Sequence, residues 1–372
     1  MSSARYQDAL RQMLAPAQVR VNGHNPWDIQ VRDPTFARRV LAQGTLGVGE
    51  SYMDGQWDCE RLDEMMFRVF RAGIDQHLPG LRIWWASLLA RLFNPQTPTR
   101  SYKVGQQHYD IGDDLYQRML DPRMIYSCAY WRTAQTLEAA QEAKLDLVCR
   151  KLGLQPGMKV LDIGCGWGGA AQFAAQRYGV HVTGVTISRN QAATARRRCE
   201  GLPVDIRLCD YRSLEGRFDR IYSLGMFEHV GPRNYQGYFQ TARRLLADDG
   251  LMILHTIGQN TTQQANDPWI ERYIFTNSVI PSMAQIARAV EGAFVVEDWH
   301  GFGPHYDRTL LAWHERFNAH WPEIADHYGE RFQRMWNFWL LASAAYFRAR
   351  RDQLWQVVLS PNGVPGGYNE VR

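Results

Sequence analysis

Short apolar runs alternate with helical patterns along the middle of the chain. The first run, over residues 160–163, is followed directly by several glycines. Strands that alternate with helices at this spacing predict βαβ units, and therefore a parallel sheet with helices on both faces. We expect strands over 160–163, 181–187, 204–208, 218–224 and 251–257, and helices over 169–178, 190–199 and 235–246.

Two further apolar runs lie near the end of the chain, over residues 294–299 and 354–359. A long helical pattern over 308–350 separates them. Because a sheet that is otherwise parallel often carries an antiparallel strand at its edge, this arrangement suits an antiparallel edge pair.

The pattern changes before residue 101. Residues 94–100 are polar and include two prolines, a composition typical of a linker. We expect a small, mainly helical domain over 1–93 and a catalytic domain over 101–372. Residues 81–93 place tryptophans and leucines beside arginines, so they suit a membrane interface or internal packing equally well.

Composition limits the class of protein. Of the 372 residues, 45% are hydrophobic and 22% are charged, as in ordinary globular proteins. The net charge of +4 is too small for a nucleic-acid-binding surface but is compatible with contact to an anionic membrane. Six cysteines without a CxxC pair argue against structural zinc or disulfides, and no metal site is expected.

The N-terminal residues and the length of the apolar runs bear on the compartment. The first residues lack the apolar core of a signal peptide, and no run reaches the roughly 18 apolar residues of a membrane span. We expect a cytoplasmic protein that touches a membrane without crossing it.

The sharpest local motif is a D-x-G-x-G-x-G-G loop that leaves the first predicted strand. Glycines there allow a tight turn and a close approach to a ligand, with a helix starting at the same point. The spacing differs from the dinucleotide fingerprint, and an acidic residue before the glycines suits a ligand with a cationic amino-acid end. This favours S-adenosylmethionine over a nicotinamide. The expected loop residues are Asp162, Gly164, Cys165, Gly166, Trp167 and Gly168.

Polar residues follow the next two predicted strands, where a nucleotide site collects its contacts. For any one of these residues, ordinary loop polarity is an equally good explanation. Asp210 is a candidate acceptor for the adenine amino group. The expected cofactor contacts at these two strand ends are Thr186, Ile187, Ser188 and Gln191, then Asp210, Tyr211 and Arg212.

Several motifs together strongly resemble those of cyclopropane-fatty-acyl-phospholipid synthases, almost from end to end of the chain. They are the glycine loop, Tyr126-Ser127-Cys128-Ala129-Tyr130-Trp131, Thr186-Ile187-Ser188, Met226-Phe227-Glu228-His229-Val230-Gly231, Leu254-His255-Thr256-Ile257-Gly258, Glu50-Ser51-Tyr52-Met53-Asp54-Gly55 and His108-Tyr109-Asp110.

The resemblance implies a Rossmann-like α/β catalytic domain of the class I S-adenosylmethionine-dependent methyltransferases. It implies transfer of a methylene unit from S-adenosylmethionine to a cis double bond of a phospholipid acyl chain. It also implies a homodimer at the inner face of the membrane, with no nucleic-acid partner. Tyr126 and Ser127 would join the cofactor site, and a bicarbonate base would be held by Cys128, Glu228, His255, Tyr306 and the backbone of Ile257.

One residue departs from the pattern of this family. Ser343 stands where some family members carry a cysteine, so a thiolate at that position is not expected to be essential. A methyltransferase acting on a small amine is the main alternative, and the N-terminal region argues against it. A non-catalytic membrane-binding protein and a nucleic-acid methyltransferase are weaker alternatives.

Overall fold

The computed structural model describes residues 3–77, 112–263 and 265–372. These residues divide into two compact units, which are described separately. The first unit combines the described part of Met1–Phe93 with Ala265–Thr276 and Tyr306–Asp352. The second unit holds the described part of Asn94–Gln264 together with Asn277–His305 and Gln353–Arg372.

Some predictions fall outside the described residues. The linker over 94–100 is among them, and so are the boundary that it marks and the tryptophan-rich segment over 81–93. The motif His108-Tyr109-Asp110 also lies there. Within the described ranges, no helix is long and apolar enough to span a membrane.

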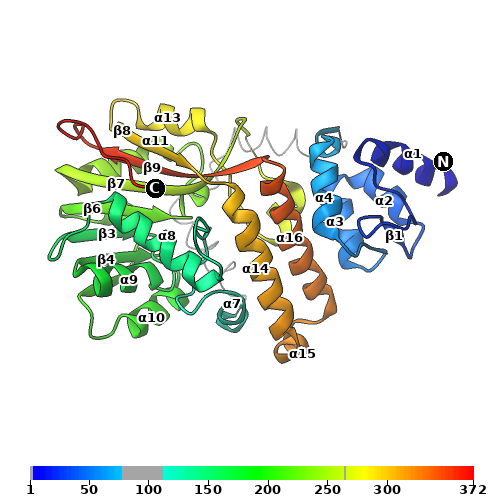
Figure 1. The fold of residues 1–372 in the computed structure, drawn as a ribbon, viewed down its shortest axis with the longest axis horizontal. Helices are drawn as coiled ribbons and strands as arrows, with labels where there is room; N and C mark the ends of the chain where they lie inside the picture. Colours follow the sequence, from blue (N-terminus) through cyan, green and yellow to red (C-terminus); the bar gives the residue numbers. More distant parts are fainter. Residues whose placement is uncertain (1–2, 78–111, 264) are drawn as a thin grey trace. The chain divides into compact units, whose positions relative to one another are not determined.

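A seven-stranded sheet forms the centre of the second unit, in the order β5-β4-β3-β6-β7-β9-β8 (Figure 1). The chain winds from β3 outward to β5 and then returns to the other side of β3 with β6, as in doubly wound folds. The pairs joining β5, β4, β3, β6 and β7 are parallel, whereas β8 and β9 are antiparallel. The strands are β3 (Lys159–Ile163), β4 (His181–Thr186), β5 (Val204–Leu208), β6 (Phe218–Leu224), β7 (Leu246–Gln259), β8 (Val295–Gly301) and β9 (Asp352–Ser360).

Helices cover both faces of this sheet. One apolar core joins α11 and α13 to side chains from β3, β6, β7 and β9. A second core joins α8 and α9 to the opposite face. The helices of this unit are α7 (Asp113–Met119), α8 (Leu137–Lys151), α9 (Gly169–Tyr178), α10 (Arg189–Arg198), α11 (Tyr235–Leu245) and α13 (Met283–Val290).

The predicted sheet and its antiparallel late pair are therefore confirmed. The expected bounds of α9, β5 and β6 agree with the structure to the residue. The fifth strand is longer than expected, since β7 already begins at Leu246, directly after α11. The late helical region is interrupted at Trp321–Glu323 and again at Gly329, so it forms three helices.

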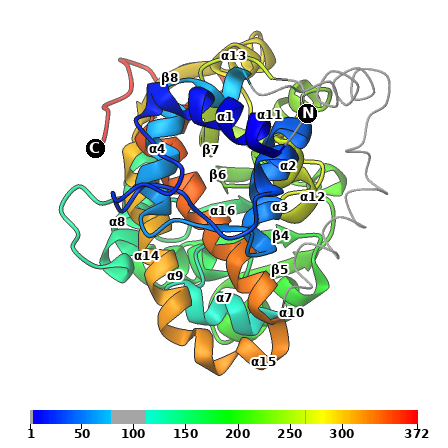
Figure 2. The same ribbon diagram turned by 90° about the vertical axis from the view of Figure 1, so that its right-hand side faces the viewer.

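The first unit is mainly helical. Figures 1 and 2 show α3 and α4 lying along α16, although these helices are far apart in the sequence. One short two-stranded sheet, β1 (Gln30–Val31) with β2 (Trp57–Asp58), completes it. The helices are α1 (Ser3–Leu14), α2 (Phe36–Gln43), α3 (Thr45–Met53), α4 (Leu62–Arg71), α12 (Pro268–Tyr273), α14 (Pro304–His320, from Tyr306 onward), α15 (Ala325–Tyr328) and α16 (Glu330–Arg348).

Aromatic packing joins these separate segments. The Trp269 ring of α12 lies 4.8 Å from the Phe338 ring of α16, and the Tyr52 ring of α3 lies 5.6 Å from the same phenylalanine. A Cβ atom placed on Gly49 would be only 2.3 Å from Nε1 of Trp269. A glycine is therefore required where α3 meets α12.

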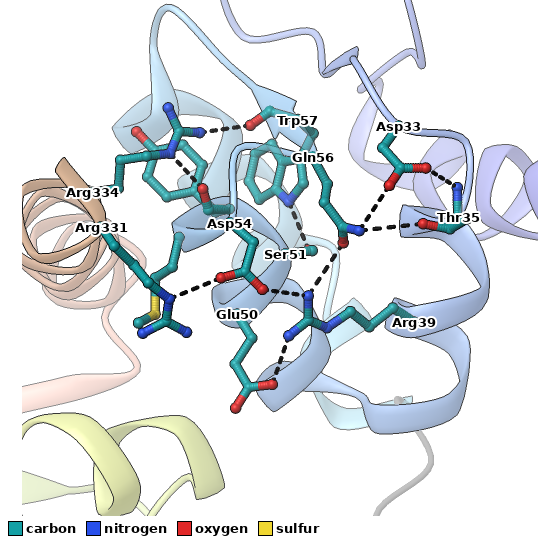
Figure 3. Close-up of polar contacts among 12 residues, drawn as sticks. Asp33, Thr35, Arg39, Glu50, Ser51, Asp54, Gln56, Trp57, Arg331 and Arg334 are labelled. Carbon is teal, nitrogen blue, oxygen red and sulfur yellow. Dashed lines mark hydrogen bonds and ion pairs between the residues drawn. The ribbon is translucent and has the colours of Figure 1, made fainter.

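A polar network surrounds this contact (Figure 3). Arg39 binds Glu50 at 2.8 Å and Asp54 at 2.7 Å, and Asp54 also accepts from Arg331 of α16 at 2.9 Å. Arg334, one turn further along α16, donates to the Trp57 carbonyl at 2.9 Å. These bonds hold the N-terminal helices and the late helix together within one unit.

Candidate active site

The glycine loop connects β3 to α9 in the second unit. Gly164, Gly166 and Gly168 have φ values of +88°, +52° and +80°, the left-handed region that favours glycine. The amides of Gly164 and Cys165 both donate to the Val185 carbonyl of β4, at 3.0 and 2.9 Å. The loop is thus fixed to the neighbouring strand at the carboxyl end of the sheet.

Two of these glycines are needed for packing and one is not. A Cβ atom on Gly164 would lie 2.7 Å from Met226, and one on Gly168 would lie 2.9 Å from Ala195. A Cβ atom on Gly166 would meet no protein atom within 4 Å. The space beside Gly166 is therefore the part of the loop that a ligand can approach.

Asp162 is the last residue but one of β3 and is only 1% exposed. Its Oδ2 atom has no hydrogen-bond partner in the described part of the chain. Burial raises the pKa of Asp162 to about 7, against the opposing effects of the Tyr222 hydroxyl and the Lys144 ammonium. A buried carboxylate oxygen that lacks a partner suits the cationic amino group of S-adenosylmethionine.

The polar residues after β4 are bonded mainly to one another. The Thr186 hydroxyl donates to the side-chain oxygen of Gln191 at 2.9 Å, and the Ser188 hydroxyl accepts from the backbone N–H of Gln191 at 3.3 Å. Ser188 is the N-cap of α10, so it has a structural task whether or not it binds a ligand. Ile187 lies between Thr186 and Ser188, directly after β4.

Asp210, after β5, has an internal partner. Arg212 contacts both carboxylate oxygens, at 2.8 and 2.6 Å, and its backbone amide donates to Asp210 at 2.9 Å. Burial opposes ionisation here, but the bonds to Arg212 hold the pKa of Asp210 below its usual range. The Tyr211 ring lies 5.4 Å from that of Tyr238. An adenine amino group would share this carboxylate with Arg212.

Residues 126–128 lie in a loop before α8. The Tyr116 ring bridges two expected cofactor residues, lying 5.2 Å from Tyr126 and 4.9 Å from Trp167. Trp167 in turn donates its indole N–H to Asp113 at 3.0 Å. Cys128 is fully buried. These contacts join the 126–128 segment to the glycine loop through α7.

The candidate base site lies after β6 and along β7. Glu228 accepts from the Ile257 amide at 2.7 Å through Oε1, while its Oε2 atom is buried without a partner in the described ranges. His255 pairs with Leu224 across the two strands, and its carbonyl accepts from the Gly225 amide at 2.9 Å. The predicted pair therefore shares one sheet edge, and the Ile257 N–H is used to orient Glu228.

Burial sets the charge of both groups. It raises the pKa of Glu228 to about 6 and lowers the pKa of His255 well below its ordinary value, so the imidazole is neutral at pH 7. Gln356 contacts Nδ1 of His255 at 3.3 Å. With the Gln356 amide nitrogen donating, the ring proton lies on Nε2, which is buried and unpartnered among the described residues.

The remaining predicted base-site residue, Tyr306, belongs to the first unit. It is buried on α14, with its ring 4.6 Å from Phe347 and 5.9 Å from Trp313. The second unit holds the other four members of the predicted set, which are Cys128, Glu228, His255 and Ile257.

Two functional candidates were missed by the sequence analysis. Gln141 and Lys144 of α8 are fully buried beside the 126–128 segment, where Lys144 donates to the Ser127 hydroxyl at 2.9 Å. A signal was present, because both fall on the apolar stripe of α8. That buried stripe includes Leu137, Ala140, Gln141, Lys144, Leu145 and Val148.

Comparisons with known proteins identify the family. A family model described as mycolic acid cyclopropane synthetase matches residues 96–357. The chain belongs to this family.

The similarity to individual cyclopropane synthetase relatives extends further. The chain is 55% identical over 366 residues to the cyclopropane-fatty-acyl-phospholipid synthase of Escherichia coli K12, covering 97% of this chain and 94% of that protein. The solved structure of the cyclopropane synthase MmaA2 from Mycobacterium tuberculosis matches with a TM-score of 0.66 and 34% identity, covering 69% of this chain and 97% of that one.

A second solved structure bears on the cofactor. The mycolic acid cyclopropane synthase CmaA1, solved with SAH and CTAB, matches with a TM-score of 0.65 and 33% identity. It covers 69% of this chain and 97% of its own. These neighbours confirm the predicted class I S-adenosylmethionine-dependent methyltransferase fold.

Proposed function

We propose that this protein transfers a methylene unit from S-adenosylmethionine to the cis double bond of an unsaturated phospholipid acyl chain, as a cyclopropane-fatty-acyl-phospholipid synthase. The observation that carries the proposal is the 55% identity to the Escherichia coli enzyme across 97% of the chain. That match includes the N-terminal region, which the mycolic acid family model does not reach.

The cofactor residues support this assignment through their chemistry. S-adenosylmethionine, when bound, supplies an electrophilic methyl group. Asp162 would accept a hydrogen bond from the amino group of the cofactor, and Ser127 would donate one to its carboxylate. The cofactor would lie against the open side of Gly166. Buried polar groups that converge on one ligand fix its orientation, which matters because an alkene is a weak nucleophile.

Ring closure needs a proton acceptor. Methyl addition leaves a positive charge on the acyl chain, and loss of one proton from the added methyl group closes the ring. Glu228 Oε2 and His255 Nε2 are buried polar atoms without partners in the described part of the chain, so they suit a small, hydrogen-bonding anion such as bicarbonate. Neutral His255 would donate to that anion, and Glu228, with its pKa near 6, would share a proton with it.

The lipid substrate places the protein at a membrane. We infer that it acts at the inner face of the membrane as a peripheral homodimer, in which two membrane-binding faces would hold more tightly than one. Residues 81–93 are the candidate contact, by their mixture of tryptophan, leucine and arginine.

The deciding experiment is incubation with S-adenosylmethionine and vesicles of unsaturated phospholipid, followed by mass spectrometry of the acyl chains. We expect a gain of one CH2 for each double bond. Matched vesicles of saturated phospholipid serve as the control and should gain nothing. Unmodified acyl chains together with methylation of an added small amine would refute the proposal and favour an amine methyltransferase.

A further inference from the structure

A lysine lies on the buried face of α8. Lys144 of α8 has no exposed surface, and its Nζ atom donates to the Ser127 hydroxyl at 2.9 Å. Burial lowers the pKa of Lys144 to about 8, while Asp121, Cys128 and Asp162 raise it. The side chain therefore remains largely a cation at pH 7.

The cation has no direct ionic partner. In the ranges that the structure describes, Lys144 forms no ion pair, and Ser127 is its single hydrogen-bond partner. Asp121 lies nearby, but its two oxygens accept the amides of Ile125 and Arg123, at 2.8 and 3.0 Å. A buried ammonium is costly unless an anion balances it, so this position needs an explanation beyond packing.

The neighbouring Gln141 already performs the structural task. Its amide nitrogen donates to the Ser127 carbonyl at 2.9 Å and to the Ile125 carbonyl at 3.4 Å. Gln141 thus holds the backbone of the segment before Cys128 against α8. Lys144, one turn later on the same face, donates its hydrogen bond to the side chain of Ser127 and not to the backbone.

The direction of this bond determines what Ser127 can do. An ammonium group only donates, so the Ser127 oxygen accepts and its own proton is turned elsewhere. A hydroxyl fixed in this way is a donor, and a nearby positive charge strengthens its bond to an anion. Asp162 lies within electrostatic range of Lys144, and its Oδ2 atom is buried without a partner in the described part of the chain, so it can accept from a cationic group. Ser127 and Asp162 would thus bind the carboxylate and the amino group of an amino acid, respectively.

We propose that Lys144 is a positioning residue that holds the Ser127 hydroxyl as a donor to the carboxylate of the cofactor's amino-acid end and balances the charge of that carboxylate. This inference rests on the proposed function, since it takes S-adenosylmethionine as the ligand. It assigns Lys144 no part in methyl transfer itself.

The test compares two ligands that differ in the amino-acid end. S-adenosylhomocysteine carries that end, whereas 5′-methylthioadenosine lacks it. In Lys144→Met, calorimetry should show about a 10- to 100-fold weaker affinity for S-adenosylhomocysteine, the range for hydrogen bonds to charged groups. The affinity for 5′-methylthioadenosine should be unchanged. The KM for S-adenosylmethionine should rise while kcat changes little.

Two further variants separate positioning from folding. Ser127→Ala should show the same selective loss, and the double variant should lose no more than either single one, because the two residues act on one carboxylate. Gln141→Leu is the matched control, since it removes bonds to the backbone only. It should lower the melting temperature and weaken both ligands alike. Lys144→Met should melt no lower than the wild type, because it removes an unpaired buried charge.

Several outcomes would overturn the inference. Undiminished affinity of Lys144→Met for S-adenosylhomocysteine, or an equal loss for both ligands, would show that Lys144 only supports the fold. If Lys144→Met does not fold, Lys144→Gln and Ser127→Ala carry the same test. A wild-type protein that binds S-adenosylhomocysteine but makes no cyclopropane would refute the proposed function alone. A wild-type protein that binds neither ligand would refute both.

Discussion

Replacement of Glu228 by glutamine is the sharpest test of the base site. Glutamine keeps the carbonyl oxygen that accepts from the Ile257 amide at 2.7 Å, so the local backbone should be retained. It replaces the buried, unpartnered Oε2 atom by an NH2 group that cannot take a proton. The change therefore removes one chemical property and very little shape.

The expected loss can be estimated. Removing one well-placed polar group from a closed site costs about 10²–10³ in rate, which corresponds to about 3–4 kcal/mol of activation free energy. Affinity for S-adenosylhomocysteine should change little, since the glycine loop and Asp162 make those contacts. His255→Gln should behave in the same way. If both residues serve one anion, the double variant should be far more active than the product of the single losses predicts.

The pH dependence of the stability of Glu228→Gln should show the effect of burying the carboxyl group. Burial raises the pKa of Glu228 from 4.5 to about 6, so the protonated form is favoured in the folded protein. Protonated Glu228 therefore stabilises the folded state relative to ionised Glu228 by up to about 2 kcal/mol. This contribution is complete below pH 4.5 and is lost as the pH rises through about 6. The free energy of unfolding of Glu228→Gln relative to the wild type should therefore increase by up to this amount between pH 4.5 and pH 8.

The assay measures cyclopropane formation in carbonate-depleted buffer, with and without added bicarbonate, at saturating lipid and cofactor. Wild-type activity should depend on bicarbonate, and that dependence should be strongly reduced in Glu228→Gln. Full wild-type activity without bicarbonate would eliminate the anion site and leave Glu228 as the base. A Glu228→Gln rate within a few-fold of wild type would refute the role of Glu228 altogether.

Three further predictions concern other parts of the chain. Gly166→Val should fold but lose S-adenosylmethionine binding in calorimetry. Its side chain would enter the space beside the loop, and the φ of +52° disfavours valine. An unchanged affinity would show that the loop is not part of the cofactor site. Gly49→Val should lower the melting temperature by several degrees, because its Cβ atom would collide with Trp269, and an unchanged melting temperature would contradict the tight contact. The double variant Trp84→Ser, Trp85→Ser should sediment less with vesicles than the wild type. Normal sedimentation with a lower melting temperature would show that these tryptophans are core residues.

The sheet and its loops could be predicted because local pattern determines them. Apolar runs of strand length and glycines at turn positions gave the bounds of β5 and α9, and they placed Gly164 and Gly168 where the backbone needs positive φ values. The antiparallel pair of β8 and β9 agrees with the edge pair expected from two late apolar runs separated by a long helical region.

Side-chain partners could not be predicted in the same way. Asp210 is a predicted acceptor for the cofactor, but the contacts of Arg212, two residues later, with both of its oxygens were not predicted. Lys144 lies within an apolar stripe, but lysine is so rarely buried that the stripe alone does not predict its burial. The bond from the Ile257 amide to Glu228 was not predicted either. These outcomes depend on tertiary neighbours, which periodicity does not reveal.

The make-up of the first unit has a consequence for biosynthesis. Its N-terminal helices leave the ribosome long before α16, which ends at Arg348, has been translated. At the usual ~5–20 residues per second, the interval between the end of α4 at Arg71 and that point is roughly 15–55 s. During this time the faces of α3 and α4 that later cover α16 lack their partner. The nascent chain should therefore be a substrate for chaperones that bind exposed apolar helices, and the unit should close only when synthesis is almost finished.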